Sequence, residues 1–92
     1  RFISLILTGE NESSLEKEAS KFKLFLQNEI KGKVLGPVSA PIFRIKRKYR
    51  VRLLVRGPKT LQLQNSLALI ISKYKFLSGI KLSVDVDPIS FN

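Results

Sequence analysis

Cationic side chains are the most prominent chemical feature of this sequence, and they gather in its middle. Thirteen lysines and arginines lie between Glu29 and Asp85, and no acidic residue interrupts them. A net charge of +10 that is spread this unevenly predicts an anionic partner. Nucleic acid is the first candidate and an acidic protein tail the second. A membrane surface ranks last of the three, since no helix pairs a basic face with exposed aromatics.

The densest part of this region mixes cations with aromatic side chains. Seven cations are candidate phosphate contacts, namely Arg44, Lys46, Arg47, Lys48, Arg50, Arg52 and Arg56. Phe43 and Tyr49 are candidate stacking residues, because aromatic rings stack on unpaired bases. Strand alternation assigns Tyr49 to the inner face, so core packing competes with stacking there. Lys59, at a strand–helix turn, is a candidate contact for an acidic tail. The alternative is a solvated basic hairpin that only keeps the domain soluble.

Residues that could catalyse a reaction are scarce, and we expect no enzymatic activity from this chain. Without Cys or His, imidazole chemistry, Cys nucleophiles and zinc sites with those ligands are excluded. Asp85 and Asp87 lie two apart on one strand face, where they could hold a hard cation or act as acid and base. We expect them to be structural, because no third ligand is apparent. No Gly-rich loop is present to cradle a phosphate. The sequence therefore predicts no catalytic residue, metal site or cofactor.

A length of 92 residues predicts a single domain over residues 1–92. Hydrophobic periodicity and turn residues divide it into strands and helices. We expect strands at 2–7, 49–56 and 80–86, helices at 11–30 and 60–76, an edge strand at best over 34–41, and a loop over 42–48. No apolar run reaches about 18 residues, so no membrane-spanning helix is predicted.

The first predicted helix has a clear apolar stripe. The stripe consists of Leu15, Ala19, Phe22, Leu26 and Ile30, which recur at steps of three and four residues. Ser13 with Glu16 fits a capping box at the helix start, and Gly32 is expected to end the helix in a left-handed conformation. The helix should pack through this stripe and turn three lysines to solvent, namely Lys17, Lys21 and Lys23.

The 49–56 segment is the clearest strand. Its odd-numbered residues, 49 to 55, point one way, and Arg50, Arg52 and Arg56 point the other. In the order β-α-β-β-α-β, two helices pack on one face of a four-stranded, mostly antiparallel sheet and leave the other face partly open. The predicted fold is therefore an α+β, ferredoxin-like sandwich with the arginines on its open side.

Three motifs, in this order, resemble one known family. They are Leu35-Gly36-Pro37 followed by Ala40-Pro41, a basic stretch running into the YRVRLL segment at 49–54, and Asp85-Val86-Asp87-Pro88 near the end. Together they cover about residues 34 to 90. They are similar to the C-terminal domain of primosomal protein N-prime, the bacterial replication-restart DNA helicase. This chain departs from the family at Val51, where relatives often carry an aromatic residue, and the departure weakens a stacking role for that strand.

The resemblance implies roles for a larger parent protein. It implies that the parent recognises stalled or branched replication forks independently of sequence and unwinds DNA with 3′-to-5′ polarity using ATP. It implies a cytoplasmic location, with single-stranded-DNA-binding protein and other primosome proteins as partners. ATP, Mg and Zn are expected only in the upstream domains. The chain itself is then expected to be a monomeric accessory domain that binds single-stranded or forked DNA without sequence preference and helps to position the helicase core.

Three alternatives stay open at this point. A protein-docking module would use the basic face to bind the acidic tail of single-stranded-DNA-binding protein, or would pack on the helicase lobes. An RNA-binding module is possible because ferredoxin-like sheets commonly present aromatics to RNA, but the middle strands lack an RNP-type aromatic pair. An acylphosphatase-like hydrolase would need a catalytic Arg in a Gly-rich loop, and residues 8–11 do not offer one.

Overall fold

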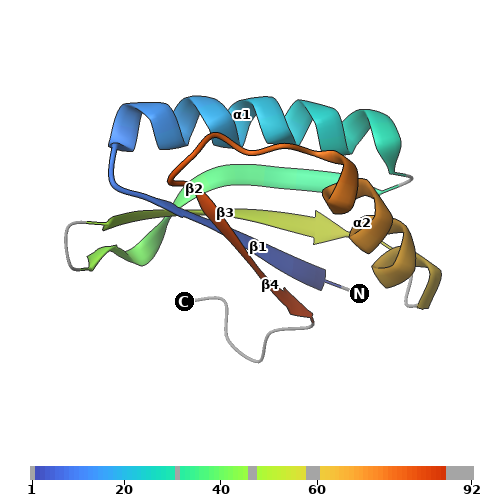
Figure 1. Ribbon diagram of the computed structural model, residues 1–92. Helices are drawn as coiled ribbons and strands as arrows, with labels where there is room; N and C mark the ends of the chain where they lie inside the picture. The colour runs from blue at the N-terminus through green and yellow to red at the C-terminus, as the bar shows by residue number, and fades with distance from the viewer. Residues whose placement is uncertain (1, 31, 46–47, 58–60, 87–92) are drawn as a thin grey trace.

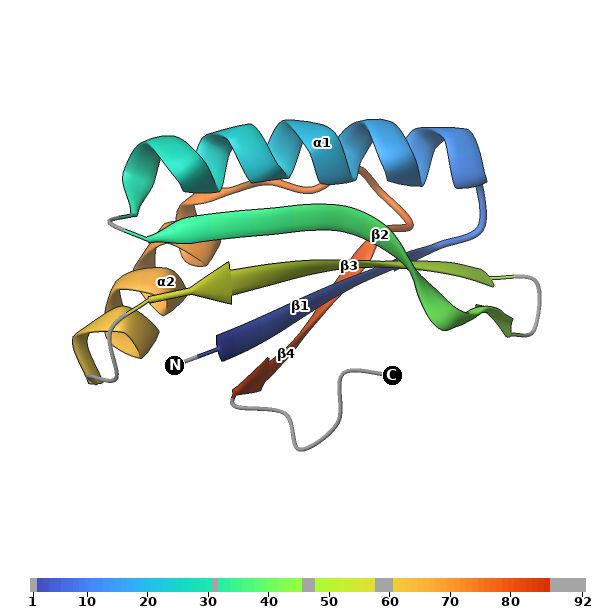
Figure 2. The ribbon, with the colours of Figure 1, turned by 180° about the vertical axis from the view of Figure 1, so that it is seen from behind.

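The chain folds into a four-stranded antiparallel sheet with both helices on one side (Figure 1 and Figure 2). The computed structural model describes residues 2–30, 32–45, 48–57 and 61–86, with side chains over 2–30, 32–38, 48–57 and 64–85. The elements are β1 (Phe2–Gly9), α1 (Glu12–Glu29), β2 (Lys33–Ile45), β3 (Lys48–Arg56), α2 (Leu61–Lys73) and β4 (Lys81–Val86). The sheet order is β2-β3-β1-β4, and all neighbouring strands are antiparallel. The α+β, ferredoxin-like prediction is confirmed.

The core lies between α1 and the two central strands of the sheet. The strands contribute alternate residues, namely Ile3, Leu5 and Leu7 of β1 and Val51, Leu53 and Val55 of β3. All five residues of the stripe predicted for α1 are buried against them. Because strand side chains alternate between faces, this burial leaves the other residues of β1 and β3 on the side without helices.

The end of α2 differs from the prediction. The helix ends at Lys73, three residues before the expected Phe76. Beyond it, Tyr74 and Phe76 turn toward α1 and join Phe22 and Phe25 in an aromatic cluster with ring centroids 4.7 to 5.0 Å apart. Tilted and edge-on packing of this kind is favourable for aromatic pairs. The packing of these rings in the core outweighs continuation of the helix.

A buried carboxylate fixes the connection from α2 to β4 onto α1. Glu18 of α1 is only 3% exposed. The Tyr74 hydroxyl donates to Glu18 Oε1 at 3.2 Å, and the Leu77 backbone N–H donates to Oε2 at 2.8 Å. Both oxygens of the carboxylate therefore have partners, as a buried charge requires.

The β2 edge strand is longer than predicted. It runs to Ile45, so the loop expected over 42–48 is wrong. Register shifts occur between Leu35 and Val38 and between Ser39 and Arg44, which lets a proline-containing segment stay in the sheet. Gly36 is required at the first shift, because its φ is +104° and a Cβ there would lie 2.8 Å from the Arg52 carbonyl oxygen.

The ends of α1 also differ from the expected caps. Asn11, and not Ser13, is the N-cap, and its side chain accepts a hydrogen bond from the Ser14 N–H at 2.9 Å. Gly32 is not left-handed; a Cβ there would lie 2.7 Å from the Arg56 carbonyl oxygen, so close approach to β3 requires a glycine. Lys23 does not simply face solvent, because its ammonium donates to the Gly36 carbonyl at 2.6 Å.

Truncation of a core leucine in β3 tests the assignment of the strand's two faces. Leu53→Ala is expected to lower the free energy of unfolding by about 2–5 kcal/mol, because Leu53 is fully buried in a central strand. Chemical denaturation measures the loss. Leu54→Ala is the control, since Leu54 lies on the opposite face and is only half-buried. An equal or larger loss for Leu54→Ala would show that the faces are reversed.

The contact between Tyr74 and Glu18 predicts a pH dependence of stability. Burial raises the pKa of Tyr74 to about 12, and the charge of Glu18 and the hydrogen bond to it act in the same direction. An unfolded tyrosine titrates near about 10, so the folded state retains the proton at intermediate pH. The contribution of this group to stability is therefore complete below pH ~10 and falls as the pH rises from ~10 toward ~12.

Tyr74→Phe isolates this contribution from the other groups that titrate at alkaline pH. The difference in unfolding free energy between the wild-type chain and Tyr74→Phe should be constant near neutrality and shrink with rising pH. Denaturant titrations at a series of alkaline pH values measure it. A difference that does not change with pH would contradict the raised pKa.

Candidate nucleic-acid interface

The sheet face opposite the helices, here called the outer face, collects cations from three strands. On β3, Arg50, Arg52 and Arg56 alternate with buried residues and therefore point away from α1. The strand register adds Lys33 of β2, which lies opposite Arg56. It also adds Lys81 of β4, which shares a row across β1 with Arg50. The fold thus assembles one cationic surface from residues far apart in the sequence.

These cations extend along the outer face and are not confined to one corner. Lys33 and Arg56 lie at one end, Arg50 and Lys81 lie at the other, and Arg52 lies between them. Residues two apart on a strand are about 6.6–6.8 Å apart. Each nucleotide of a DNA strand carries one phosphate charge, so a row of cations with this spacing can contact several phosphates of one strand. The spacing therefore allows successive cations to follow a nucleic-acid backbone across the sheet.

Apolar side chains lie among the cations in the middle of the outer face, on β2, β3 and β1, and are here called the apolar band. Leu35 lies opposite Leu54, and Val38 lies in the row of Arg52 and Ile6. Val38 is 52% exposed and pairs with Arg52 directly after the first register shift of β2. Single exposed apolar residues are ordinary, but these lie in adjoining rows of one surface. The band can contact sugars and bases between phosphate contacts, or the apolar surface of a protein.

Acidic residues are segregated from this surface. Four of the seven lie on α1, in the helix layer. Among the described strand residues, Asp85 of β4 is the one carboxylate on the outer face, and it lies opposite Ser4. Asp87, the second residue of the predicted acidic pair, lies outside the described residues. The outer face therefore carries a strongly positive potential.

The structure brings together part of the predicted set of phosphate contacts. Arg50, Arg52 and Arg56 share the outer face, whereas Lys48 lies at the start of β3, near Glu10. Phe43 and Arg44 belong to β2 by their backbone, but their side chains are outside the described set. The remaining predicted contacts lie outside the described residues, namely Lys46, Arg47 and Lys59.

Tyr49 lies on the helix side of β3. It is partly buried and packs against the hydrophobic core. Of the two roles that the sequence left open for this residue, the geometry supports core packing.

Sequence reasoning missed two cations of the outer face, Lys33 and Lys81. Both lie outside the dense basic stretch, and pairing across the sheet brings them to it. For Lys81 a signal was present in the sequence, because its alternation with apolar residues in the last predicted strand assigns it to the face opposite the core.

Within the described ranges, no three His, Cys, Asp or Glu side chains lie together as a metal site would require. In the same part of the chain, neither helix has the length and apolar character needed to cross a membrane.

Known proteins are similar in sequence to this chain over nearly its whole length. A family model described as the primosomal protein N C-terminal domain matches residues 1–89. Replication restart protein PriA of Rickettsia felis is 35% identical over 88 residues, which cover 96% of this chain and 13% of that protein. The same-named protein of Synechocystis sp. is 32% identical over 94 residues, covering 100% of this chain and 11% of that protein. The chain thus spans roughly an eighth of the length of these curated relatives. It belongs to the primosomal protein N C-terminal domain family.

Proposed function

We propose that this chain is the sequence-nonspecific DNA-binding domain of a replication restart helicase. In this role it contacts single-stranded or forked DNA at stalled or branched replication forks and helps to position the helicase core. The observation that carries the proposal is the outer face, where the register of four strands gathers Lys33, Arg50, Arg52, Arg56 and Lys81 on the side without helices. The names of the relatives place the family in replication restart.

The chemistry of the outer face suits phosphates better than base edges. Arginines and lysines neutralise phosphates, and the release of condensed counterions then drives binding irrespective of sequence. Sequence-specific readout needs side chains that enter a groove, commonly from a helix or a two-stranded ribbon. Here both helices lie on the opposite layer, and the outer face is a broad sheet surface (Figure 1). The domain would therefore recognise DNA by charge and shape.

The catalytic work of the proposed parent would lie elsewhere. The chain covers 13% of the length of its relative from Rickettsia felis, and the family description places it at the C-terminal end. ATP hydrolysis, Mg²⁺ binding, a zinc module and 3′-to-5′ unwinding would then belong to upstream parts of that protein. The role of this domain would be to hold DNA for them.

A second candidate function is protein docking, and the apolar band supports it. Val38 and Leu35 are exposed beside cations, which is the pairing that an acidic peptide with apolar residues would require. The acidic tail of single-stranded-DNA-binding protein and the helicase lobes of the parent are the two expected partners. Competition between DNA and an acidic peptide for the same arginines distinguishes the two functions.

Salt dependence provides the first test of DNA binding. If four to six cations contact phosphates, log Kd against log salt concentration should have a slope of magnitude about 3 to 5. Arg50→Gln/Arg52→Gln should weaken binding and reduce that magnitude by roughly 1.4 to 1.8. Glutamine keeps part of the aliphatic stem of each arginine, so the thermal midpoint should change little. Fluorescence anisotropy with a labelled single strand measures the affinities.

The matched control removes the same charge from the helix layer. Lys17→Gln/Lys21→Gln alters two exposed lysines of α1 and should leave the slope nearly unchanged. A flat salt response, an equal effect of both double variants, or a strong preference among sequences of equal length would contradict the proposed function.

A further inference from the structure

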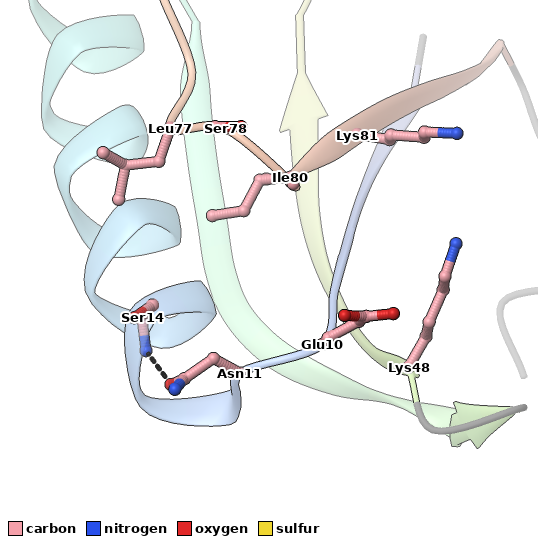
Figure 3. A pocket seen from close by; sticks show the side chains of 9 residues that line it. Glu10, Asn11, Ser14, Lys48, Leu77, Ser78, Ile80 and Lys81 are labelled. Carbon is pink, nitrogen blue, oxygen red and sulfur yellow. Dashed lines mark hydrogen bonds between the residues drawn. The ribbon is translucent and has the colours of Figure 1, made fainter.

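A cleft, here called the end cleft, opens at one end of the sheet. It lies between the start of α1 (residues 10–14) and the turn before β4 (residues 77–81), with Lys48 of β3 at its side (Figure 3). Its volume is about 610 Å³. Small-molecule sites in proteins range from about 300 to 1,000 Å³, so the cleft can hold a group the size of one nucleotide.

The two sides of the end cleft differ in chemistry. Figure 3 shows the charged ends of Lys48, Lys81 and Glu10 on one side, and the side chains of Leu77 and Ile80 on the other. Leu77 is 55% exposed, so its side chain is accessible to a ligand and is not buried in the core. Within the described part of the chain, neither lysine forms an ion pair. This division suits a ligand that has an anionic part and a flat apolar part.

The end cleft is continuous with the outer face. Lys81 belongs to both, because it lines the cleft and also shares a row with Arg50 across β1. A DNA strand that crosses the outer face at its Arg50 end therefore reaches Lys81 and the mouth of the cleft. A phosphate held there would lie at the mouth of the cleft and face its apolar wall (Figure 3).

We propose that the end cleft binds one unpaired nucleotide of DNA that lies on the outer face. Lys48 and Lys81 hold its phosphates, Leu77 and Ile80 pack against its base, and Glu10 accepts a hydrogen bond from the base edge. This inference rests on the proposed function and adds to it a means of distinguishing single strands from duplex.

Glu10 supplies that distinction. An ionised carboxylate only accepts hydrogen bonds, so it needs an N–H group from the ligand. Each of the four bases offers at least one N–H on its Watson–Crick edge, so the contact does not depend on sequence. In a duplex these groups are occupied by the partner strand, and the base is enclosed in the stack. The site therefore selects unpaired bases without selecting among them.

The apolar wall of the end cleft is held in place before any ligand arrives. The Ile80 N–H donates to the Leu77 carbonyl at 3.2 Å across a tight turn, in which Gly79 has a φ of +89°. The Leu77 N–H donates in turn to the buried Glu18 of α1. Because the wall is anchored at its backbone, truncation of the Leu77 side chain alters the cleft without releasing the turn.

An abasic strand separates base contacts from phosphate contacts. Affinities of the 92-residue chain are measured for oligothymidylate, an abasic strand of the same length and a blunt duplex, at one salt concentration. The wild-type chain should bind oligothymidylate roughly threefold to tenfold more tightly than the abasic strand. Leu77→Ala and Glu10→Ala should each reduce that ratio toward one. Glu10→Ala should also strengthen duplex binding, because it removes a negative charge from the cationic surface.

Leu69→Ala is the matched control, since Leu69 is a 65% exposed leucine of α2 that does not line the cleft. It should keep the wild-type ratio.

Equal wild-type affinity for oligothymidylate and the abasic strand would overturn the nucleotide site, while weakened binding by Arg50→Gln/Arg52→Gln would still support the proposed function. Absence of DNA binding at low salt would overturn both. Loss of acidic-peptide binding, with unchanged DNA binding, in Leu77→Ala would overturn the inference in favour of a peptide site.

Discussion

Burial of one face of β3 beneath α1 is the constraint on which the placement of the cations depends. Val51, Leu53 and Val55 are held in the core, and a strand has a side-chain period of two. The arginines between and beside them therefore have to point away from the helices. A slip of one residue in the register with β1 would place arginines in the core and core residues in water, so the register and the cationic surface are set together.

Glu18 links this sheet surface to the helix layer. Its carboxylate accepts from Tyr74 and from the Leu77 backbone, and so ties the segment before β4 to α1. The groove between α2 and β4 is only partly filled, because Val84 is exposed although it faces the helices. Pairing with β1 sets the position of β4 and of Lys81 at its start, and the Glu18 anchor adds a tie between α1 and the segment before the strand.

The sequence predicted what local periodicity can encode. The α1 stripe, the alternation of β3 and the order of the elements follow from residues within one element, and all are observed. The length of β2 could not be predicted, because Pro37 and Pro41 argue against a strand and only the register shifts beside β3 accommodate them. Glu18 is separated from its two partners by 56 and by 59 positions in the sequence, and local patterns carry no signal over such a distance. For the same reason Lys33 and Lys81 were missed as members of the cationic surface.

The outer face has five cations and one described carboxylate, whereas α1 carries four carboxylates and three lysines, and this asymmetry gives the domain an electric dipole moment directed across its two layers. In the field of any polyanion, such a molecule experiences a torque that turns the sheet toward the polyanion before contact. Electrostatic steering of this kind can raise association rates by about 10- to 10³-fold. At an ionic strength of about 0.1 M the field extends only about 10 Å, so the domain would complete this rotation during the last part of its diffusional approach.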